Sequence, residues 1–83
     1  MPSVVIPANP TKLRQVRESL GVTQESLVRR AQGLQLRTYV RIEQGQGRAR
    51  YDTATAILGA INEILREAEK PEMKLEDLEI RLF

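Results

Sequence analysis

Gly21–Gly45, GVTQESLVRRAQGLQLRTYVRIEQG, is the stretch of sequence that decides the fold. Its apolar residues recur at helical spacing in two short runs, which predicts two helices joined by a tight turn. The apolar positions are Val22, Leu27, Val28 and Ala31 in the first run and Leu34, Tyr39 and Ile42 in the second. Because helices this short are unstable alone, they must pack on others. The pattern predicts a helix-turn-helix.

The ends of both predicted helices carry recognisable signals. Thr23 is suited to cap the first helix, whereas Gln35, which precedes the second, is a poorer cap. The residue before each cap and the fourth residue of each helix are apolar, as in a hydrophobic staple. Gly33 supplies the bend between the helices, and Gly45 is placed to end the second one.

Helical spacing continues on both sides of this unit. A first helix is predicted from Asn9-Pro10 or Thr11 up to Gly21, with an apolar stripe facing its neighbours. A basic loop follows Gly45, and a longer helix, capped by Asp52 or Thr53, then extends to about Glu69. Pro71 breaks the helical pattern.

The two ends of the chain carry short patterns typical of strands. Ser3–Ile6 is interpreted as a lead-in, a packed arm or an added strand. Leu78–Phe83 fits a helical turn followed by an extended piece, although its alternation favours a short strand. Since a strand needs a partner, pairing of the two segments, within one chain or between two copies, is an open alternative.

A length of 83 residues predicts a single domain. With the helical spacing, we expect an all-α domain over residues 1–83, with a helical core over 9–69, an N-terminal arm over 1–8 and a C-terminal tail over 70–83. The chain has no cysteine and no histidine, which excludes disulfides, thiolate metal sites and imidazole catalysis. The acidic residues 76–79 lack the ligand spacing of a calcium loop and are interpreted as a solvated face. We expect no enzyme activity, no cofactor and no metal. No apolar run is long enough to span a membrane, and no signal peptide is evident, which predicts a cytoplasmic protein.

Charge is distributed unevenly along the chain. Residues 12–50 carry nine basic and three acidic side chains, a net charge of +6, whereas residues 51–83 carry four basic and eight acidic ones, a net charge of −4. Such a basic half favours a polyanionic partner, although surface arginines that only contact solvent would give the same count.

Several short motifs occur in a familiar order. They are Thr23-Gln24-Glu25-x-Leu27, Gly33, Thr38, Arg41-Ile42-Glu43-x-Gly45 and Asp52–Ile57. In order and spacing they resemble the Cro/repressor-type (XRE-type) helix-turn-helix DNA-binding domain family, over about Leu13 to Leu65. The resemblance implies a lambda-repressor-like bundle of four to five short helices. Two departures, a turn one residue longer at Ala31-Gln32-Gly33 and the weak cap Gln35, leave the tilt of the second helix open.

A helix fits the major groove of duplex DNA, and its exposed side chains can then read base edges. With Tyr39 and Ile42 turned inward, the candidate base-reading residues are Gln35, Leu36, Arg37, Val40 and Arg41. Arg37 and Arg41 are four residues apart and so share a face, and arginine matches the two acceptors of guanine. Leu36 and Val40 either contact thymine methyl groups or pack on a neighbour.

Other polar residues are candidates for phosphate contacts. The resemblance implies this role for Gln24, at the start of the first helix of the unit. The remaining candidates are Arg29, Thr38, Gln44, Arg48 and Arg50. The alternative for Thr38 is a small packing residue. The resemblance also implies a partly buried ion pair between Arg17 and Glu43, which would orient the reading helix on its scaffold.

The function predicted from the sequence is sequence-specific binding of double-stranded DNA by a transcriptional regulator, a repressor in bacteria or phages that acts on the nucleoid. One reading helix specifies few base pairs, so a homodimer on half-sites about 34 Å apart is expected. The acidic and apolar part Ile64–Phe83 is the predicted dimerisation surface. The alternative is a protein-interaction module, or an antitoxin-like protein with a protein partner, on the same fold.

Overall fold

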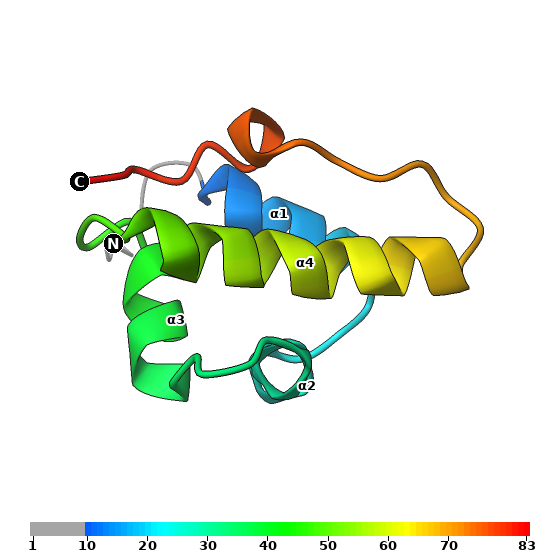
Figure 1. Ribbon diagram of the computed structural model, residues 1–83, viewed down its shortest axis with the longest axis horizontal. Helices are drawn as coiled ribbons and strands as arrows, with labels where there is room; N and C mark the ends of the chain where they lie inside the picture. The colour runs from blue at the N-terminus through cyan, green and yellow to red at the C-terminus, as the bar shows by residue number, and fades with distance from the viewer. Residues whose placement is uncertain (1–9) are drawn as a thin grey trace, which may run out of the picture.

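The computed structural model describes residues 10–83, and within that range the chain is all-helical (Figure 1). The elements are α1 (Lys12–Ser19), α2 (Gln24–Arg30), α3 (Leu36–Glu43), α4 (Tyr51–Glu67) and a short 3-10 helix, η1 (Leu75–Leu78). The prediction of a small all-α bundle is therefore confirmed. The run Ser3–Ile6 lies outside the described residues.

Side-chain caps fix the start of two helices. The hydroxyl of Thr11 accepts a hydrogen bond from the backbone N–H of Arg14 at the start of α1, and Thr23 does the same for Ser26 in α2. Gln35 makes no such bond before α3, in keeping with its weak capping ability. The expected cap of α4 at Asp52 or Thr53 is wrong, because that helix begins at Tyr51 with Arg50 in the capping position.

The helix α4 forms the centre of the core. It packs against α2 and η1, while α2 also packs against α3 and α1 packs against η1 (Figure 1). The largest fully buried side chains come from every one of these elements, namely Tyr39, Leu13, Leu27, Ile57, Ile61 and Leu78. Burial of each such side chain contributes roughly 1.5–3 kcal/mol. The core therefore holds the two short helices α2 and α3, which would not be stable alone.

A five-residue connection, 31–35, joins α2 to α3. Gly33 in this connection has a φ of +76°, a left-handed conformation that favours glycine. In Figure 1, α2 is seen nearly end-on while α3 runs vertically, so the two helices cross steeply, as in a helix-turn-helix.

The C-terminal tail differs from the strand that its alternation favoured. Leu75 and Leu78 lie one turn apart on η1, and Leu78 is buried in the core. Among residues 10–83, a single parallel bridge follows, between Leu82 and Ala49. The strand prediction is wrong because burial of the leucines against α1 and α4 takes precedence over pairing, and the helical turn followed by an extended piece is what forms.

A buried asparagine holds the tail on α4. The side-chain amide of Asn62 donates to the backbone C=O of Met73 at 3.0 Å, and its carbonyl oxygen accepts from the Met73 N–H at 2.8 Å. Ile64, Leu65 and Leu78 are also buried, so these three apolar residues of the segment predicted as a dimerisation surface belong to the core of their own chain.

Candidate nucleic-acid interface

The helix α3 has one buried and one exposed face. Tyr39, Ile42 and Glu43 are at most 8% exposed, so they form its inner face. On the outer face, Arg37 and Arg41 are exposed and follow each other one turn apart. Of the two apolar residues predicted to point outward, Leu36 is 39% exposed, whereas Val40 is half-buried.

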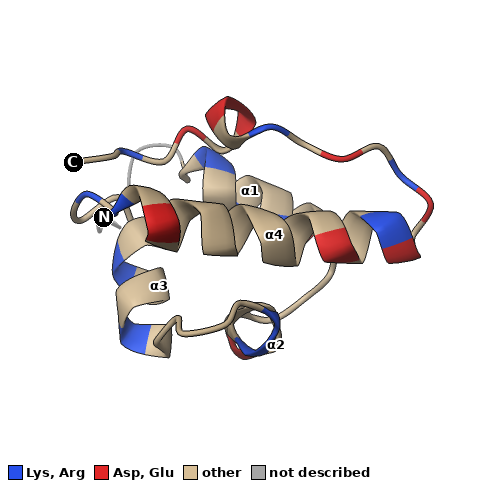
Figure 2. Cartoon of the chain, viewed as in Figure 1, with Lys and Arg blue, Asp and Glu red and all other residues tan. Residues whose placement is uncertain are grey.

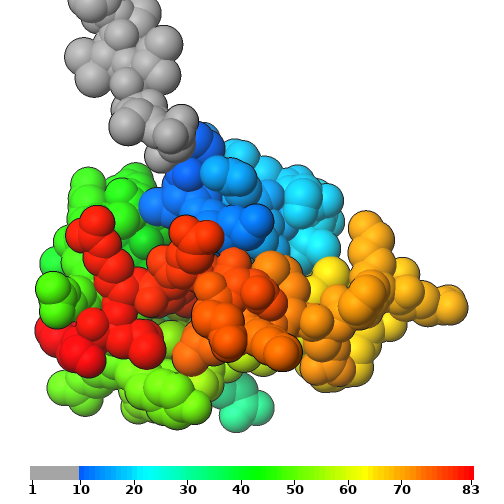
Figure 3. Space-filling model, turned by 90° about the horizontal axis from the view of Figure 1, so that it is seen from above, coloured from blue at the N-terminus to red at the C-terminus, as the bar shows by residue number. Residues whose placement is uncertain are grey.

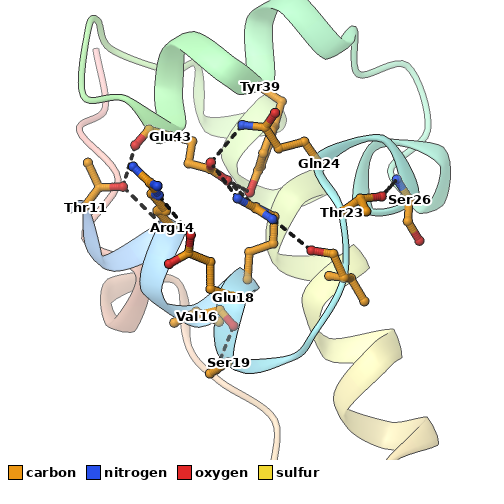
Figure 4. A network of polar contacts seen from close by, with 12 residues as sticks. Thr11, Arg14, Val16, Glu18, Ser19, Thr23, Gln24, Ser26, Tyr39 and Glu43 are labelled. Atoms are coloured by element: carbon orange, nitrogen blue, oxygen red, sulfur yellow. Dashed lines mark hydrogen bonds and ion pairs between the residues drawn. The ribbon is translucent and has the colours of Figure 1, made fainter.

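The Glu43 carboxylate is the centre of a hydrogen-bond network beneath α3 (Figure 4). Arg17 donates to it twice, from Nε at 2.7 Å and from Nη2 at 3.1 Å. The Tyr39 hydroxyl donates at 2.6 Å, and the Gln24 side-chain nitrogen donates at 2.8 Å. The ion pair between Arg17 and Glu43 thus joins α1 to the end of α3, and Gln24 adds the start of α2.

The network keeps Glu43 charged in spite of its burial. Burial alone would raise the pKa of this carboxyl, but the hydrogen bonds from Arg17, Tyr39 and Gln24 outweigh it, so the pKa lies below its ordinary value. Conversely, the hydrogen bonds to Glu43 raise the pKa of Arg17, although burial opposes this. Burial, followed by the hydrogen bond to Glu43, raises the pKa of Tyr39. The only carboxylate of α3 is therefore neutralised on the inner side of the helix.

A second contact fixes the C-terminal end of α3. The hydroxyl of Thr11 donates to the backbone carbonyl of Glu43, one of the carbonyls that a helix end leaves without an internal partner. Gly45 follows with a φ of +74°, and a Cβ added there would lie 3.4 Å from the Thr11 methyl carbon. The orientation of α3 is thus set by α1 through two separate contacts.

The arginines on the outer face of α3 have no acidic partner. Within residues 10–83, ion pairs involve Arg14, Arg17, Arg30 and Arg66, and none involves Arg37 or Arg41. Figure 2 shows basic bands on α3 and the loop after it, whereas acidic bands lie on α4 and the tail. The outer face of α3 is therefore an exposed positive surface.

The loop between α3 and α4 extends this positive surface. Arg48 and Arg50 are exposed on either side of Ala49, which is buried and fixed to the tail by two backbone hydrogen bonds. The Arg41 side chain reaches the same loop, since its Nη2 would lie 3.8 Å from a Cβ at Gly47. The structure thus brings together Arg41 and the loop that carries the other two arginines.

The candidate residues of α2 are arranged differently. Arg29 is exposed and free of ion pairs within the described part of the chain, but it lies in the last turn of α2, about 7.5 Å along the helix from Gln24. One N–H of the Gln24 amide is already used on Glu43, which leaves its second N–H for another acceptor. The neighbouring Arg30 bonds Glu63 and Glu67 instead, and joins α2 to α4.

The two remaining candidates of α3, Thr38 and Gln44, are both exposed. Because Thr38 is exposed, the alternative that it is a small packing residue is wrong. The exposed Gln35 completes the set just before the helix.

Three contacts to Glu43, those of Tyr39, Gln24 and Thr11, were missed from the sequence. Tyr39 and Glu43 are four residues apart on one helix, and that spacing was a usable signal for their hydrogen bond. Thr11 lies 32 positions from Glu43, and no local pattern indicates that contact.

No group of acidic side chains suited to a metal ion occurs among residues 10–83. No helix in that same range is long and apolar enough to cross a membrane. Compared with protein-family models, with curated proteins and with solved structures, the chain gives no match. The resemblance to the Cro/repressor-type family therefore remains a prediction.

Proposed function

We propose that this protein binds duplex DNA sequence-specifically through α3, and that it regulates transcription by occupying its site as a dimer. One observation supports this proposal above the others. Arg37 and Arg41 lie exposed on one face of α3 with no acidic partner among the described residues, while the carboxylate of Glu43 is buried and neutralised. A helix with this charge distribution suits the major groove, where arginine pairs with guanine.

Rigid support of the helix agrees with a reading role. The ends of α1 and α2 hold Glu43, and Thr11 holds the backbone of the same residue, so the arginine face is fixed relative to the rest of the bundle. A side chain must be fixed in this way if it is to distinguish base edges. In the proposed complex, Arg37 and Arg41 contact bases while Arg48 and Arg50 contact phosphates on the flank.

The first experiment is selection of bound duplexes from a random pool, followed by measurement of the affinity of the protein for the selected sequences. Each arginine that reads a guanine is worth about 1–3 kcal/mol, so Arg37→Ala or Arg41→Ala should weaken binding of the selected duplex at least about fivefold. Affinity should also fall steeply with salt.

The control is a variant with Lys70→Ala and Lys74→Ala, which removes two exposed charges from the acidic tail. This variant should keep the affinity for the selected duplex. Equal losses in the control and in the α3 variants would show non-specific attraction only, and absence of binding at low salt would refute the proposal.

The exposed Leu36 supports a second candidate, a module that binds a partner protein through the same face of α3. The two functions differ in one measurable respect. Leu36→Glu should alter the sequence preference of a DNA reader, whereas in a protein-binding module that binds no duplex it should abolish the complex with the partner.

A further inference from the structure

Large apolar side chains are exposed at one end of the molecule. Of the four that are exposed within residues 10–83, three belong to the two segments that the bridge joins, the tail and the start of α4 just after Ala49. They are Tyr51 at 67%, Leu82 at 37% and Phe83 at 84%. In Figure 3 the red C-terminal residues lie at this end, beside the green segment that contains the loop before α4. A gathering of this kind is typical of an interaction surface.

The backbone of the tail adds an open edge to this surface. Ala49 donates to the carbonyl of Arg81 at 2.8 Å and accepts from the N–H of Phe83 at 3.1 Å. In an extended chain successive residues point their backbone groups to opposite sides, so the N–H and C=O of Leu82 face away from Ala49. No residue of the described range bonds to them.

We propose that Ile80–Phe83 and Tyr51 form the surface through which two copies of this chain associate, with the two tails paired antiparallel at Leu82. A strand edge is complementary to itself under a two-fold axis, which makes a second copy the natural occupant. This inference rests on the proposed function and extends it. A dimer of this kind would supply the two reading helices that a DNA site with two half-sites needs.

The side chains fit this pairing. With the axis at Leu82, the two copies of this leucine exchange both backbone hydrogen bonds, and each Arg81 lies opposite the Phe83 of the other copy. An arginine beside an aromatic ring is a favourable contact. An axis at Arg81 would instead place two arginines opposite each other, and the backbone of that residue already faces Ala49. Only the register at Leu82 combines a free edge with compatible side chains.

The proposed surface does not include Arg37 or Arg41, although it adjoins the loop that carries Arg48 and Arg50. The bridge at Ala49 lies in the loop after α3, whereas Arg37 and Arg41 project from the outer face of the helix itself. The surface is small, so the dimer alone should be weak, with a dissociation constant in roughly the micromolar to millimolar range. Two adjacent half-sites would then strengthen the association.

The test is sedimentation equilibrium of the full chain from about 1 µM to about 1 mM, which covers the expected range of dissociation constants. The wild type should show a monomer–dimer equilibrium. Leu82→Pro removes only the outward-facing N–H and keeps both bonds to Ala49, so it should raise the dissociation constant at least about tenfold without altering the helical signal. Phe83→Glu, at the most exposed of the three residues, should do the same.

Two control variants distinguish this surface from other segments of the chain that could mediate association. Leu36→Glu removes the fourth exposed apolar residue, and Val5→Pro interrupts the β-prone run near the N-terminus. Both should dimerise as the wild type does. A wild type that stays monomeric, a dimer indifferent to Leu82→Pro and Phe83→Glu, or a dimer lost in either control would overturn the inference.

A separate measurement of duplex binding tests the proposed function independently of the dimer surface. A chain that binds a selected duplex but stays monomeric refutes the dimer surface and leaves DNA binding intact. A chain that dimerises through this edge but binds no duplex refutes DNA binding and leaves the dimer surface intact.

Discussion

Replacing Arg17 by alanine tests whether the buried network under α3 holds the fold together. Arg17 supplies two of the four hydrogen bonds to the Glu43 carboxylate and a third, at 2.8 Å, to the backbone carbonyl of Val22. The side chain of Glu43 is only 3% exposed, so the variant leaves a buried charge without its counter-ion. Removing one partner of such a pair costs about 3–5 kcal/mol.

The expected loss lies near the lower limit, about 3 kcal/mol, because Tyr39 and Gln24 still donate to the carboxylate. In a domain of this size the melting temperature should fall by roughly 12–24 °C. Circular dichroism during heating, with urea unfolding as a second measurement, gives both quantities.

The matched control is Arg14→Ala, on the same helix. Its pair with Glu18 is half-exposed, and such i,i+4 pairs contribute about 0.3–0.5 kcal/mol at most. In the double variant Arg17→Ala with Glu43→Ala, the loss should be smaller than the sum of the two single losses, because no charge is left buried. Equal melting temperatures for Arg17→Ala and Arg14→Ala would refute the reasoning.

Three further predictions concern stability. The folded pKa of Glu43 lies below the ordinary value of 4.5, so the stability that its charge contributes is present above about pH 4.5 and is lost as pH falls through the folded pKa. Between about pH 7 and about pH 2, the melting temperature of Glu43→Gln should therefore decline less steeply than that of the wild type. Parallel curves for the two proteins would count against this. Gly45→Ala should cost about 1–2 kcal/mol in urea unfolding because φ is +74°, whereas Gly59→Ala, with open space around it inside α4, should stabilise by about 0.5–1 kcal/mol; the same sign for both would contradict the assignment. Asn62→Ala should cost about 1–3 kcal/mol and speed hydrogen exchange at the Met73 amide, and unchanged exchange there would show that the tail is held by other contacts.

The helices could be predicted from the sequence because their signals are local. The apolar spacing of the Gly21–Gly45 stretch, the cap at Thr23 and the glycines at the helix ends each depend on residues within one or two turns. The inner and outer faces of α3 followed from the same spacing. The all-α class and the exposure of Arg37 and Arg41 are thus consequences of short-range patterns.

The tail could not be predicted in the same way. Its alternation at Leu78, Ile80 and Leu82 suits a strand, but alternation does not say whether a partner strand lies within reach. The packing of Leu78 under α1 and α4, and the grip of Asn62 on Met73, depend on elements brought together only by the fold. The hydrogen bond from Gln24 to Glu43 could not be predicted for the same reason, because it joins residues that only the fold brings together.

The central claim is that Arg37 and Arg41 enter the major groove of duplex DNA, and the most direct test is a nuclear magnetic resonance titration of the arginine Nε–Hε signals. On addition of a selected duplex, the signals of these two arginines should shift with the bound fraction. The Nε–Hε signal of Arg17, which is already bonded to Glu43, should stay in place. Unchanged signals for Arg37 and Arg41 at saturating duplex would contradict the account.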